Sequence, residues 1–407
     1  MTVEPMLIVE QALEQVLKEF HPLEPERVPI LQALGRVLAE DVHADADIPP
    51  YANSSMDGYA VLAADTAGAS RETPTHLHVV DELAAGYVSE TVVTSGTAIR
   101  IMTGAPIPPG ADAIVQVEET RTVGERVEVF TTVQVGQFIR PAGEDVHRGE
   151  RVLSQGTLVR PQEVGMLATL GHKAASVIRR PRVAILATGD EVVAIDAPLA
   201  PGKIRNANSY SNAAQVIRYG GIPILLGIAR DRERELTEKI RAGLAQGVDL
   251  FLTSGGVSVG DFDLVKKVLA AEGEINFWRV RMKPGKPLAF GHIGGVPVLG
   301  LPGNPVSVMV SFEMFARPAL LKMQGRTDWE RPVVAATLMN AVTHKDSRRH
   351  YLRARIEAQD GEYRAYLTGE QGSGILSSMV KANGLAIIPE EWTHAPAGAR
   401  VQAILLD

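Results

Sequence analysis

Cysteine is absent from the 407 residues of the chain, which excludes a disulfide framework, a thiolate zinc site and a cysteine nucleophile. The sequence also lacks a run of about 18 consecutive apolar residues, the length that a membrane-spanning helix needs. Its most apolar stretch, VPVLGLPGNPVSVMVSFEMF, is interrupted by Pro297, Pro302 and Pro305. We therefore expect no membrane span and no membrane partner. We expect a cytoplasmic location, with which the absence of cysteine is compatible.

An excess of basic residues is missing too, because 41 lysines and arginines stand against 48 acidic residues and the net charge is −7. Nucleic acid is therefore not an expected partner, and any anionic ligand must be held by a local group of cations. The ten histidines form no H-E-x-x-H pair, and no G-x-S-x-G turn is present. Zinc-protease and serine-hydrolase chemistry thus have no support.

The composition, 45% hydrophobic and 22% charged, is typical of a soluble globular protein of two to four domains. Residues 6–20 place apolar side chains on one helical stripe. Residues 41–177 indicate one or two irregular, mainly β units, with one helix that begins at Pro161. From Pro181 to about Gly325, apolar runs alternate with helical patterns. This alternation predicts βαβ units and a mostly parallel sheet.

The end of the sheet region and the rest of the chain carry clear local signals. The motif LPGNP predicts a helix with Asn304 as N-cap and Pro305 as first helical residue. After residue 330 the sequence is strand-like again, and Asp360-Gly361 predicts the turn of a hairpin. A small β-barrel or a sandwich is therefore expected to close the chain.

The turn TSGGVSVGDFD, residues 253–263, joins an apparent strand to an apparent helix. Glycines at positions 255, 256 and 260 allow a close approach to a ligand, and the amides of such a turn favour an anion, most often phosphate. The turn is neither a P-loop nor a dinucleotide fingerprint. Alternatively, Asp261 and Asp263 only cap the following helix.

Charged residues in other turns point to the same kind of ligand. Lys283 and Lys286 flank a Pro-Gly turn, and at about 7 Å they would repel by roughly 2 kcal/mol, which a bound anion would offset. Glu191, Asp231 and Asp263 are hard oxygen ligands at strand ends and suit Mg²⁺ with substrate phosphates. The alternatives are two solvated lysines and three capping acids.

Further polar residues lie upstream in loops to which the residues alone assign no purpose. Asp57 lies in PPYANSSMDGYAV, where an Asx-turn is the structural alternative. Thr103 precedes a proline-rich turn, and FIRPAGEDVHRG carries Arg140 and Asp145.

Seven motifs, NSSMDGYA, RIMTGAPIPPGADAIV, GED, ATGDE, TSGGVSVGDFD, MKPGKP and GLPGNPVS, occur in this order. Together they resemble the MoeA family of molybdenum insertases, which is related to the gephyrin E domain, and the match runs from about residue 7 to the C-terminus. The resemblance implies an α/β multidomain fold of four parts. These are an elongated N-terminal segment (1–50 plus 142–180), an inserted mainly-β domain (51–141), an α/β molybdopterin-binding domain with a mostly parallel sheet (181–327) and a C-terminal β-barrel (328–407).

The resemblance also implies an activity, the insertion of molybdate into adenylylated molybdopterin with Mg²⁺-dependent release of AMP, the last step of molybdenum-cofactor biosynthesis. Molybdate is then a substrate, Mg²⁺ the cofactor, and the glycine turn holds the phosphate or pyrophosphate of the pterin. The implied catalytic residues are Asp57, Glu191, Asp231 and Asp263, of which the last three hold the metal. The implied substrate-binding residues are Thr103, Arg140, Asp145, Ser254, Gly255, Gly256, Lys283, Lys286, Ser307, Arg353 and Ser373.

Family members are homodimers, so the resemblance implies that Asp57, Thr103, Arg140 and Asp145 of one subunit face the α/β domain of the other. Candidate protein partners are molybdopterin adenylyltransferase and apo-molybdoenzymes. The sequence departs from the family's R-x-E-F-x-R pattern, because RRHYLR places His350 where the acid is expected. Two alternative functions remain: a molybdopterin adenylyltransferase, whose single domain resembles residues 181–325, and a scaffold of gephyrin E-domain type. Tungstate has the same shape and charge as molybdate, so the sequence does not select between them.

Overall fold

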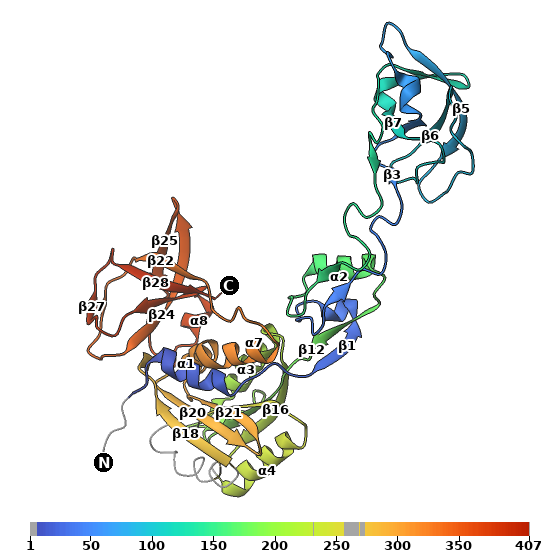
Figure 1. Cartoon of the computed structure of the whole chain (residues 1–407). Coiled ribbons are helices and arrows are strands. Elements are labelled where there is room, and N and C mark those ends of the chain that lie inside the picture. Colours follow the sequence, from blue (N-terminus) through green and yellow to red (C-terminus); the bar gives the residue numbers. More distant parts are fainter. Residues whose placement is uncertain (1–5, 231, 256–267, 269–272, 407) are drawn as a thin grey trace. The chain divides into compact units, whose positions relative to one another are not determined.

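The computed structural model describes residues 6–230, 232–255, 268 and 273–406 (Figure 1). The chain divides into two compact units. The first consists of Met1–Ala39, Leu158–Val164 and Ala174–Asp407, and the second of Glu40–Thr157 and Gly165–Lys173. Helix α2, Pro161–Thr169, contributes residues to both and begins at the proline that the sequence indicated.

The α/β region of the first unit is built on a six-stranded sheet with the order β16-β13-β17-β21-β20-β18. The strands are β13 Arg182–Thr188, β16 Ile222–Ala229, β17 Leu250–Ser254, β18 Gly273–Arg279, β20 Pro287–Ile293 and β21 Val296–Leu301. The first four in the sheet order are parallel, and β20 and β18 are antiparallel to their neighbours. This arrangement confirms the predicted mostly parallel sheet.

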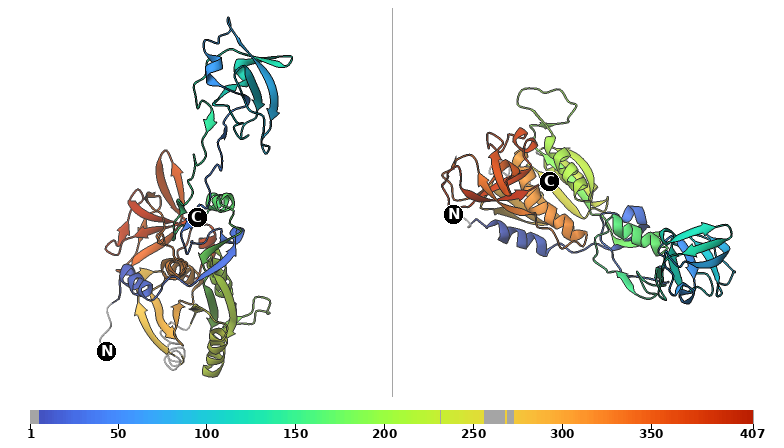
Figure 2. Two further views of the ribbon diagram at one scale, coloured as in Figure 1. Left: turned by 45° about the vertical axis from the view of Figure 1, so that its right-hand side comes forward. Right: turned by 90° about the horizontal axis from the view of Figure 1, so that it is seen from above.

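Helices cover both faces of this sheet (Figures 1 and 2). They are α1 Val9–Lys18, α3 Ala207–Arg218, α4 Glu233–Leu244, α6 Pro305–Ser311 and α7 Arg317–Met323, the last two joined by the π-type turn Phe312–Ala316. Val183 and Ile185 of β13 belong to the core under α1, α3, α6 and α7, whereas Ala184 and Leu186 belong to the core under α4. Alternate residues thus serve opposite faces, as a two-sided sheet requires.

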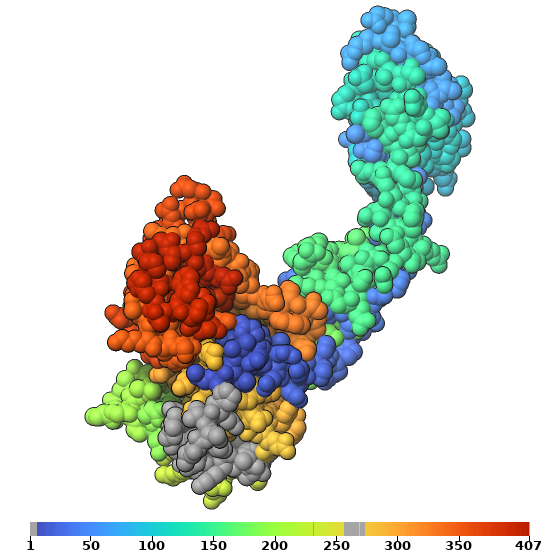
Figure 3. Space-filling model, turned by 60° about the vertical axis from the view of Figure 1, so that its left-hand side comes forward, coloured from blue at the N-terminus to red at the C-terminus, as the bar shows by residue number. Residues whose placement is uncertain are grey.

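The N-terminal helix α1 extends the larger of these cores. Its residues Val9, Ala12 and Val16 are buried. They belong to the same hydrophobic cluster as Phe312 and Phe315, and Figure 3 shows the helix in blue beside the orange segments. The helical stripe expected at residues 6–20 is therefore confirmed. No helix among the described residues is long and apolar enough to cross a membrane.

A closed barrel of five strands follows in the same unit. The strands are β22 Val333–Leu338, β24 Arg349–Gln359, β25 Glu362–Leu367, β26 Gly384–Ile388 and β28 Arg400–Leu405. Pairing of β24 with both β25 and β26 closes the ring, which decides between the barrel and the sandwich. At the predicted hairpin, Asp360 and Gly361 have φ angles of 53° and 80°, the left-handed conformations of a tight two-residue turn.

Shorter elements complete the first unit. They are β1 Pro25–Pro29, β12 Ala174–Ile178, β14 Val192–Val193, β15 Ile204–Arg205, β19 Met282–Lys283, β23 Val342–Thr343, α8 Ser377–Val380 and β27 His394–Ala395. Helix α6 begins at Pro305 as predicted, but the side chain of Asn304 makes no capping hydrogen bond. The helix expected after the GDFD motif lies outside the described residues.

The second unit contains a six-stranded sheet with the order β7-β4-β6-β5-β9-β8. Its strands are β4 Gly58–Val61, β5 Thr75–Leu83, β6 Thr97–Ile101, β7 Ala113–Gln116, β8 Thr120–Val123 and β9 Arg126–Val129. Two small pairs join β3 Asn53–Ser54 to β10 Ile139–Arg140 and β2 Val42–His43 to β11 Arg151–Leu153. The mainly-β character expected for this region is confirmed, whereas the four domain boundaries stay predictions.

Candidate active site

The carboxyl ends of four parallel strands meet at one edge of the α/β sheet. Thr188 of β13 is paired with Ala229 of β16, Ala187 with Ser254 of β17, and Ser254 with Leu301 of β21. The segments that carry Glu191, Ser254, Gly255 and Ser307 all follow these strand ends. In open α/β sheets, ligands bind at this edge.

The glycine turn after β17 depends on a residue without a side chain. Gly255 has φ = +92°, and a Cβ there would lie 2.6 Å from the carbonyl oxygen of Thr188. Its amide faces the carbonyl oxygen of Leu301 at 3.3 Å. The Oγ of Ser254 is buried and has no hydrogen-bond partner within the described parts of the chain. Gly256 and Asp263 of this turn, and Asp231 after β16, lie outside the described residues, so their roles stay predictions.

Glu191 presents a carboxylate at the same edge. Gly189 has φ = +130°, and a Cβ there would come 2.4 Å from Glu191 Oε2, so the carboxylate is folded back over the backbone of Gly189. Glu191 is exposed. Its position suits a metal contact, because an exposed carboxylate at a strand end can bind a cation without prior desolvation.

The lysine turn lies between the sheet and the barrel. Lys283 belongs to β19, which pairs in parallel with β24 and sets Lys283 opposite His350. Its ammonium lies 3.5 Å from Asp346 Oδ2. Gly285 has φ = +101°, and a Cβ there would lie 2.6 Å from Ser311 Oγ, so the turn packs against α6. The structure thus places Lys283 beside the barrel, and Lys286 of the same turn is exposed.

Arg353 is the most unusual residue of the barrel, because it is only 1% exposed and has no acidic partner among the residues that the structure describes. Its Nε donates to Ser378 Oγ at 3.0 Å, and its NH2 donates to the carbonyl oxygen of Gly372 at 3.1 Å. Burial lowers the pKa of Arg353 to about 10. A buried charge without a counter-ion is costly, so this guanidinium is well prepared to bind an anion.

Lys283 and Arg353 line one cavity of about 310 Å³. The chain segment around Ser373 connects this cavity to α6, because the amide of Val306 donates to the carbonyl oxygen of Ser373 at 3.0 Å. Ser307 is 5% exposed on that helix. The structure therefore brings Lys283, Arg353, Ser373 and Ser307 into one region at the junction of sheet and barrel.

The sequence analysis did not identify two residues of this cavity region, His344 and Asp346. His350 Nε2 lies 2.8 Å from Asp346 Oδ1, and the rings of His344 and His350 stack with centroids 3.8 Å apart. The signal was the segment HKDSRRH, in which His350 follows Asp346 by four residues. Its meaning depended on the fold, because only the pairing of β19 with β24 brings Lys283 to this segment.

In the second unit, Asp57 and Thr103 are in direct contact. Asp57 Oδ1 accepts hydrogen bonds from the Thr103 hydroxyl at 2.6 Å and the Thr103 amide at 2.7 Å. These bonds, the hydroxyl first, lower the pKa of Asp57. The next residue, Gly58, has no room for a side chain, because a Cβ there would lie 1.9 Å from the carbonyl oxygen of Val115. Asp57 therefore stays ionised at neutral pH in a fixed position.

Arg140 belongs to strand β10 of the same unit, and Asp145 lies in the loop after that strand. Arg140 of β10 is paired with Asn53 of β3, and its Nε lies 3.8 Å from Glu144 Oε2. The amide of Asp145 donates to the carbonyl oxygen of Ile48 at 2.9 Å. Both side chains are exposed and available to a ligand.

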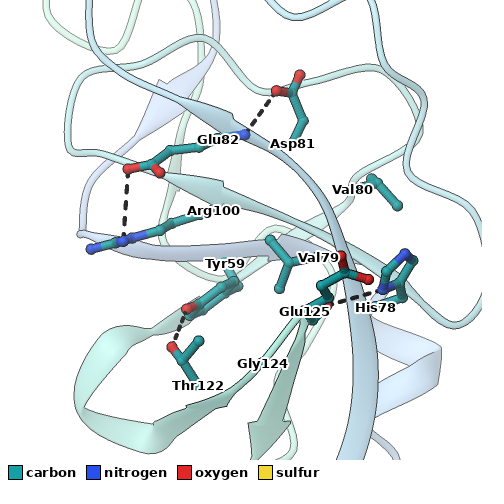
Figure 4. Close-up of a pocket in the computed structure, with 10 residues that line it drawn as sticks. All are labelled: Tyr59, His78, Val79, Val80, Asp81, Glu82, Arg100, Thr122, Gly124 and Glu125. Atoms are coloured by element: carbon teal, nitrogen blue, oxygen red, sulfur yellow. Dashed lines mark hydrogen bonds and ion pairs between the residues drawn. The ribbon is translucent and has the colours of Figure 1, made fainter.

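A larger cavity of about 530 Å³ in the second unit is a poor candidate for an anion (Figure 4). Arg100 is paired with Glu82 at 3.7 Å, and Tyr59 is hydrogen-bonded to Thr122 at 2.8 Å. Asp81 and Glu125 add further negative charge to its wall. A phosphate or oxyanion would be repelled there, so volume does not identify the site.

Comparison with known proteins agrees with this geometry. Residues 184–322 match the family model described as a probable molybdopterin binding domain, which makes the chain a multidomain protein built around a domain of that type. Residues 7–171 match the MoeA N-terminal region (domain I and II), and residues 335–406 match the MoeA C-terminal region (domain IV). The chain belongs to the MoeA family, as the order of its motifs indicated.

Relatives from several bacteria are similar over almost the whole chain. The molybdopterin molybdenumtransferase of Nostoc sp. is 38% identical over 94% of this chain and 88% of its own length. Molybdopterin molybdenumtransferase 2 of Mycobacterium tuberculosis is 38% identical over 98% of this chain and 99% of its own. The crystal structure of the molybdopterin biosynthesis moeA protein from Pyrococcus horikoshii OT3 matches with a TM-score of 0.82 and 34% identity, covering 98% of this chain and 100% of that one.

Proposed function

We propose that the protein is a molybdopterin molybdenumtransferase of molybdenum-cofactor biosynthesis. It transfers molybdate to adenylylated molybdopterin, with Mg²⁺-dependent release of AMP. The names of its relatives support the transferase activity. The observation that carries the oxyanion part is the buried guanidinium of Arg353, without an acidic partner in the described chain, in one cavity with Lys283.

Molybdate is a dianion and must approach a substrate that already carries phosphates. Lys283 and Arg353 offset this repulsion, and the hydrogen bonds of Arg353 to Ser378 and Gly372 hold its guanidinium in place before the ligand arrives. Charge-assisted bonds from a fixed donor in a dry cavity are stronger than those from a solvated one. Ser307 and Ser373 supply neutral donors beside this cavity, and Lys286 a second cation from the same turn.

The pterin phosphates are proposed to bind at the edge of the α/β sheet. The backbone of Ser254 and Gly255, continued by Gly256, accepts the phosphate portion in the glycine turn. Glu191, Asp231 and Asp263 would hold Mg²⁺, and Glu191 fits this role because its carboxylate is exposed at a strand end. A bound ion would supply positive charge beside the phosphoanhydride, and hydrolysis of that bond by water would release AMP.

A homodimer completes the proposed site. Asp57, Thr103, Arg140 and Asp145 of one subunit face Glu191, Asp231, Asp263, Lys283 and Lys286 of the other. The ionised, fixed carboxylate of Asp57 supports a role in metal binding or hydrolysis, and the exposed Arg140 a role in phosphate binding. We propose a cytoplasmic protein with molybdopterin adenylyltransferase and apo-molybdoenzymes as partners before and after the reaction.

An assay of AMP release tests this function. Purified protein, adenylylated molybdopterin, molybdate and Mg²⁺ are incubated together, and AMP is quantified by chromatography. We expect release only in the complete mixture. Asp263→Asn should slow it about 100-fold or more because a metal-binding charge is lost. A scaffold would leave AMP unreleased, and an adenylyltransferase would instead consume ATP and release pyrophosphate.

The matched control for Asp263→Asn is Asp360→Asn. The side chain of Asp360 is 93% exposed at the barrel hairpin, and asparagine tolerates its positive φ. This variant should release AMP at the parent rate. An Asp263→Asn protein that does the same would remove Asp263 from the metal site.

A further inference from the structure

The carboxylate of Asp346 holds three groups that are cationic or can become so. Arg348 NH2 lies 2.7 Å and Lys283 Nζ 3.5 Å from Oδ2, and His350 Nε2 lies 2.8 Å from Oδ1. Burial raises the pKa of Asp346, but the hydrogen bonds from Arg348 and His350 outweigh it and hold that pKa far below its usual range. Asp346 is therefore a permanent anion and a counter-ion of Lys283.

His344 and His350 form a buried pair beside this carboxylate, 8% and 3% exposed. Their rings are nearly parallel, at 21°, with centroids 3.8 Å apart, so the two cannot both be imidazolium ions. His344 Nδ1 lies 2.9 Å from the carbonyl oxygen of Asp346 and must carry a hydrogen. In the neutral ring, its Nε2 is then an acceptor, and this buried atom has no partner among the described residues.

Few titratable or charged groups pack against His350 and could take up a proton in its place. Its strand neighbours are Lys283 on β19 and the apolar Ile388 on β26, and the preceding loop contributes His344 and Asp346. Burial lowers the pKa of His350, against the hydrogen bond that its Nε2 donates to Asp346, which raises it. Burial and the nearby Lys283 thus disfavour the charged form of His350, and the adjoining cavity is lined by Lys283, Arg353 and Glu370.

We propose that oxyanion binding in this cavity is coupled to the uptake of one proton by the His344–His350 pair. The dianion attracts Lys283 away from Asp346, and the protonated pair replaces the lysine as counter-ion of that carboxylate. This inference rests on the proposed function, since it adds a proton to the same oxyanion site. His350 and His344 are then positioning residues, because their protonation determines when Lys283 is free to bind molybdate.

The side chains of His344, Asp346 and His350 also have ligand atoms within 4.8 Å of one another, a spacing that could hold a metal ion. The charges favour the anion instead. Arg348 and Lys283 both contact Asp346 Oδ2, and Arg353 lines the adjoining cavity. A divalent ion would add positive charge where the balance is already positive.

The direction of the pH effect follows from the pKa values. A dianion beside the pair raises a pKa that burial had lowered, so protons are taken up at any pH between the two values. Affinity for molybdate therefore rises as pH falls through the pKa of the bound form. Well above that pKa, the affinity no longer depends on these histidines.

Calorimetric titration of the purified protein with molybdate tests the coupling. It is performed between about pH 6 and 8, in two buffers of different ionisation enthalpy, so that protons taken up are counted. We expect uptake approaching one proton per molybdate and an affinity gain of up to about tenfold for each pH unit. His344→Gln/His350→Gln should still bind but lose most of both effects, and His21→Gln, an exposed histidine, should keep them.

Each of the other possible results would overturn either the proton coupling or the proposed function. Molybdate binding without proton uptake, or unchanged uptake in the double variant, overturns the coupling while the oxyanion site stands. No molybdate binding at any pH overturns the proposed function itself. Stoichiometric Zn²⁺ binding that the double variant loses would make the cluster a metal site instead. If the double variant does not fold, His350→Gln alone is used, and it should lower the proton count.

Discussion

Two inactive variants, Asp57→Asn and Lys283→Ala, are expected to recover about a quarter of the wild-type rate of AMP release when their subunits are mixed and exchanged. In the proposed homodimer, each variant alone lacks one essential residue at both sites. Random exchange makes about half of the dimers mixed, and each mixed dimer regains one of its two sites if the site combines both subunits. The rate is measured after partial unfolding and refolding of the equimolar mixture.

The opposite arrangement gives a different number. If Asp57 served the Lys283 of its own chain, every site in a mixed dimer would lack one residue, and the mixture would stay as inactive as its components. The control pair is Asp57→Asn mixed with Thr103→Val. Thr103 hydrogen-bonds Asp57 in the same unit, so both changes affect the same half of the site. In mixed dimers of this pair, neither site contains both Asp57 and Thr103.

Replacement of Arg353 by methionine is expected to lower molybdate affinity and AMP release by about 100- to 1,000-fold, the effect of losing a fixed donor to a reacting anion. The free energy of unfolding should change by less than about 2 kcal/mol. Two hydrogen bonds are lost, but so is the cost of burying a charge without an acidic partner among the described residues. Chemical denaturation and calorimetry measure the two effects separately.

Arg355→Met is the matched control, because Arg355 lies on the same strand, is exposed and pairs with Glu357 at 2.6 Å. It should bind molybdate like the parent protein, since an exposed ion pair contributes little. An Arg353→Met protein that unfolds much more easily, yet binds molybdate normally when folded, would show that this arginine serves the barrel and not the ligand.

The sequence predicted those parts of the fold that depend on local patterns. Alternating apolar runs and helices predicted the parallel sheet, and Asp360-Gly361 predicted a turn that only residues tolerant of positive φ can form. Pro305 marked the start of α6. Asn304 occupies the predicted N-cap position, but its side chain makes no capping hydrogen bond, because nothing in the local pattern fixes the direction of that side chain.

Features that depend on contacts between distant segments could not be predicted in this way. Asp57 was open to interpretation as an Asx-turn residue, but it binds Thr103, 46 positions further on. The sequence marked only that His350 stands where an acid is expected near Arg353, whereas the burial of Arg353 and the lack of an acidic partner among the described residues became visible only in the structure. Likewise, Asp346 gains its meaning from Lys283, which reaches it through the pairing of β19 with β24. Burial and charge balance are properties of the assembled barrel.

Anomalous diffraction from crystals grown with tungstate tests the oxyanion site most directly, because tungstate has the shape and charge of molybdate and scatters strongly. We predict a tungsten peak in the cavity of Lys283 and Arg353, with its oxygens about 3 Å from both side chains. A peak found only at the glycine turn of Ser254 and Gly255, or no peak in the cavity at saturating tungstate, would contradict this site.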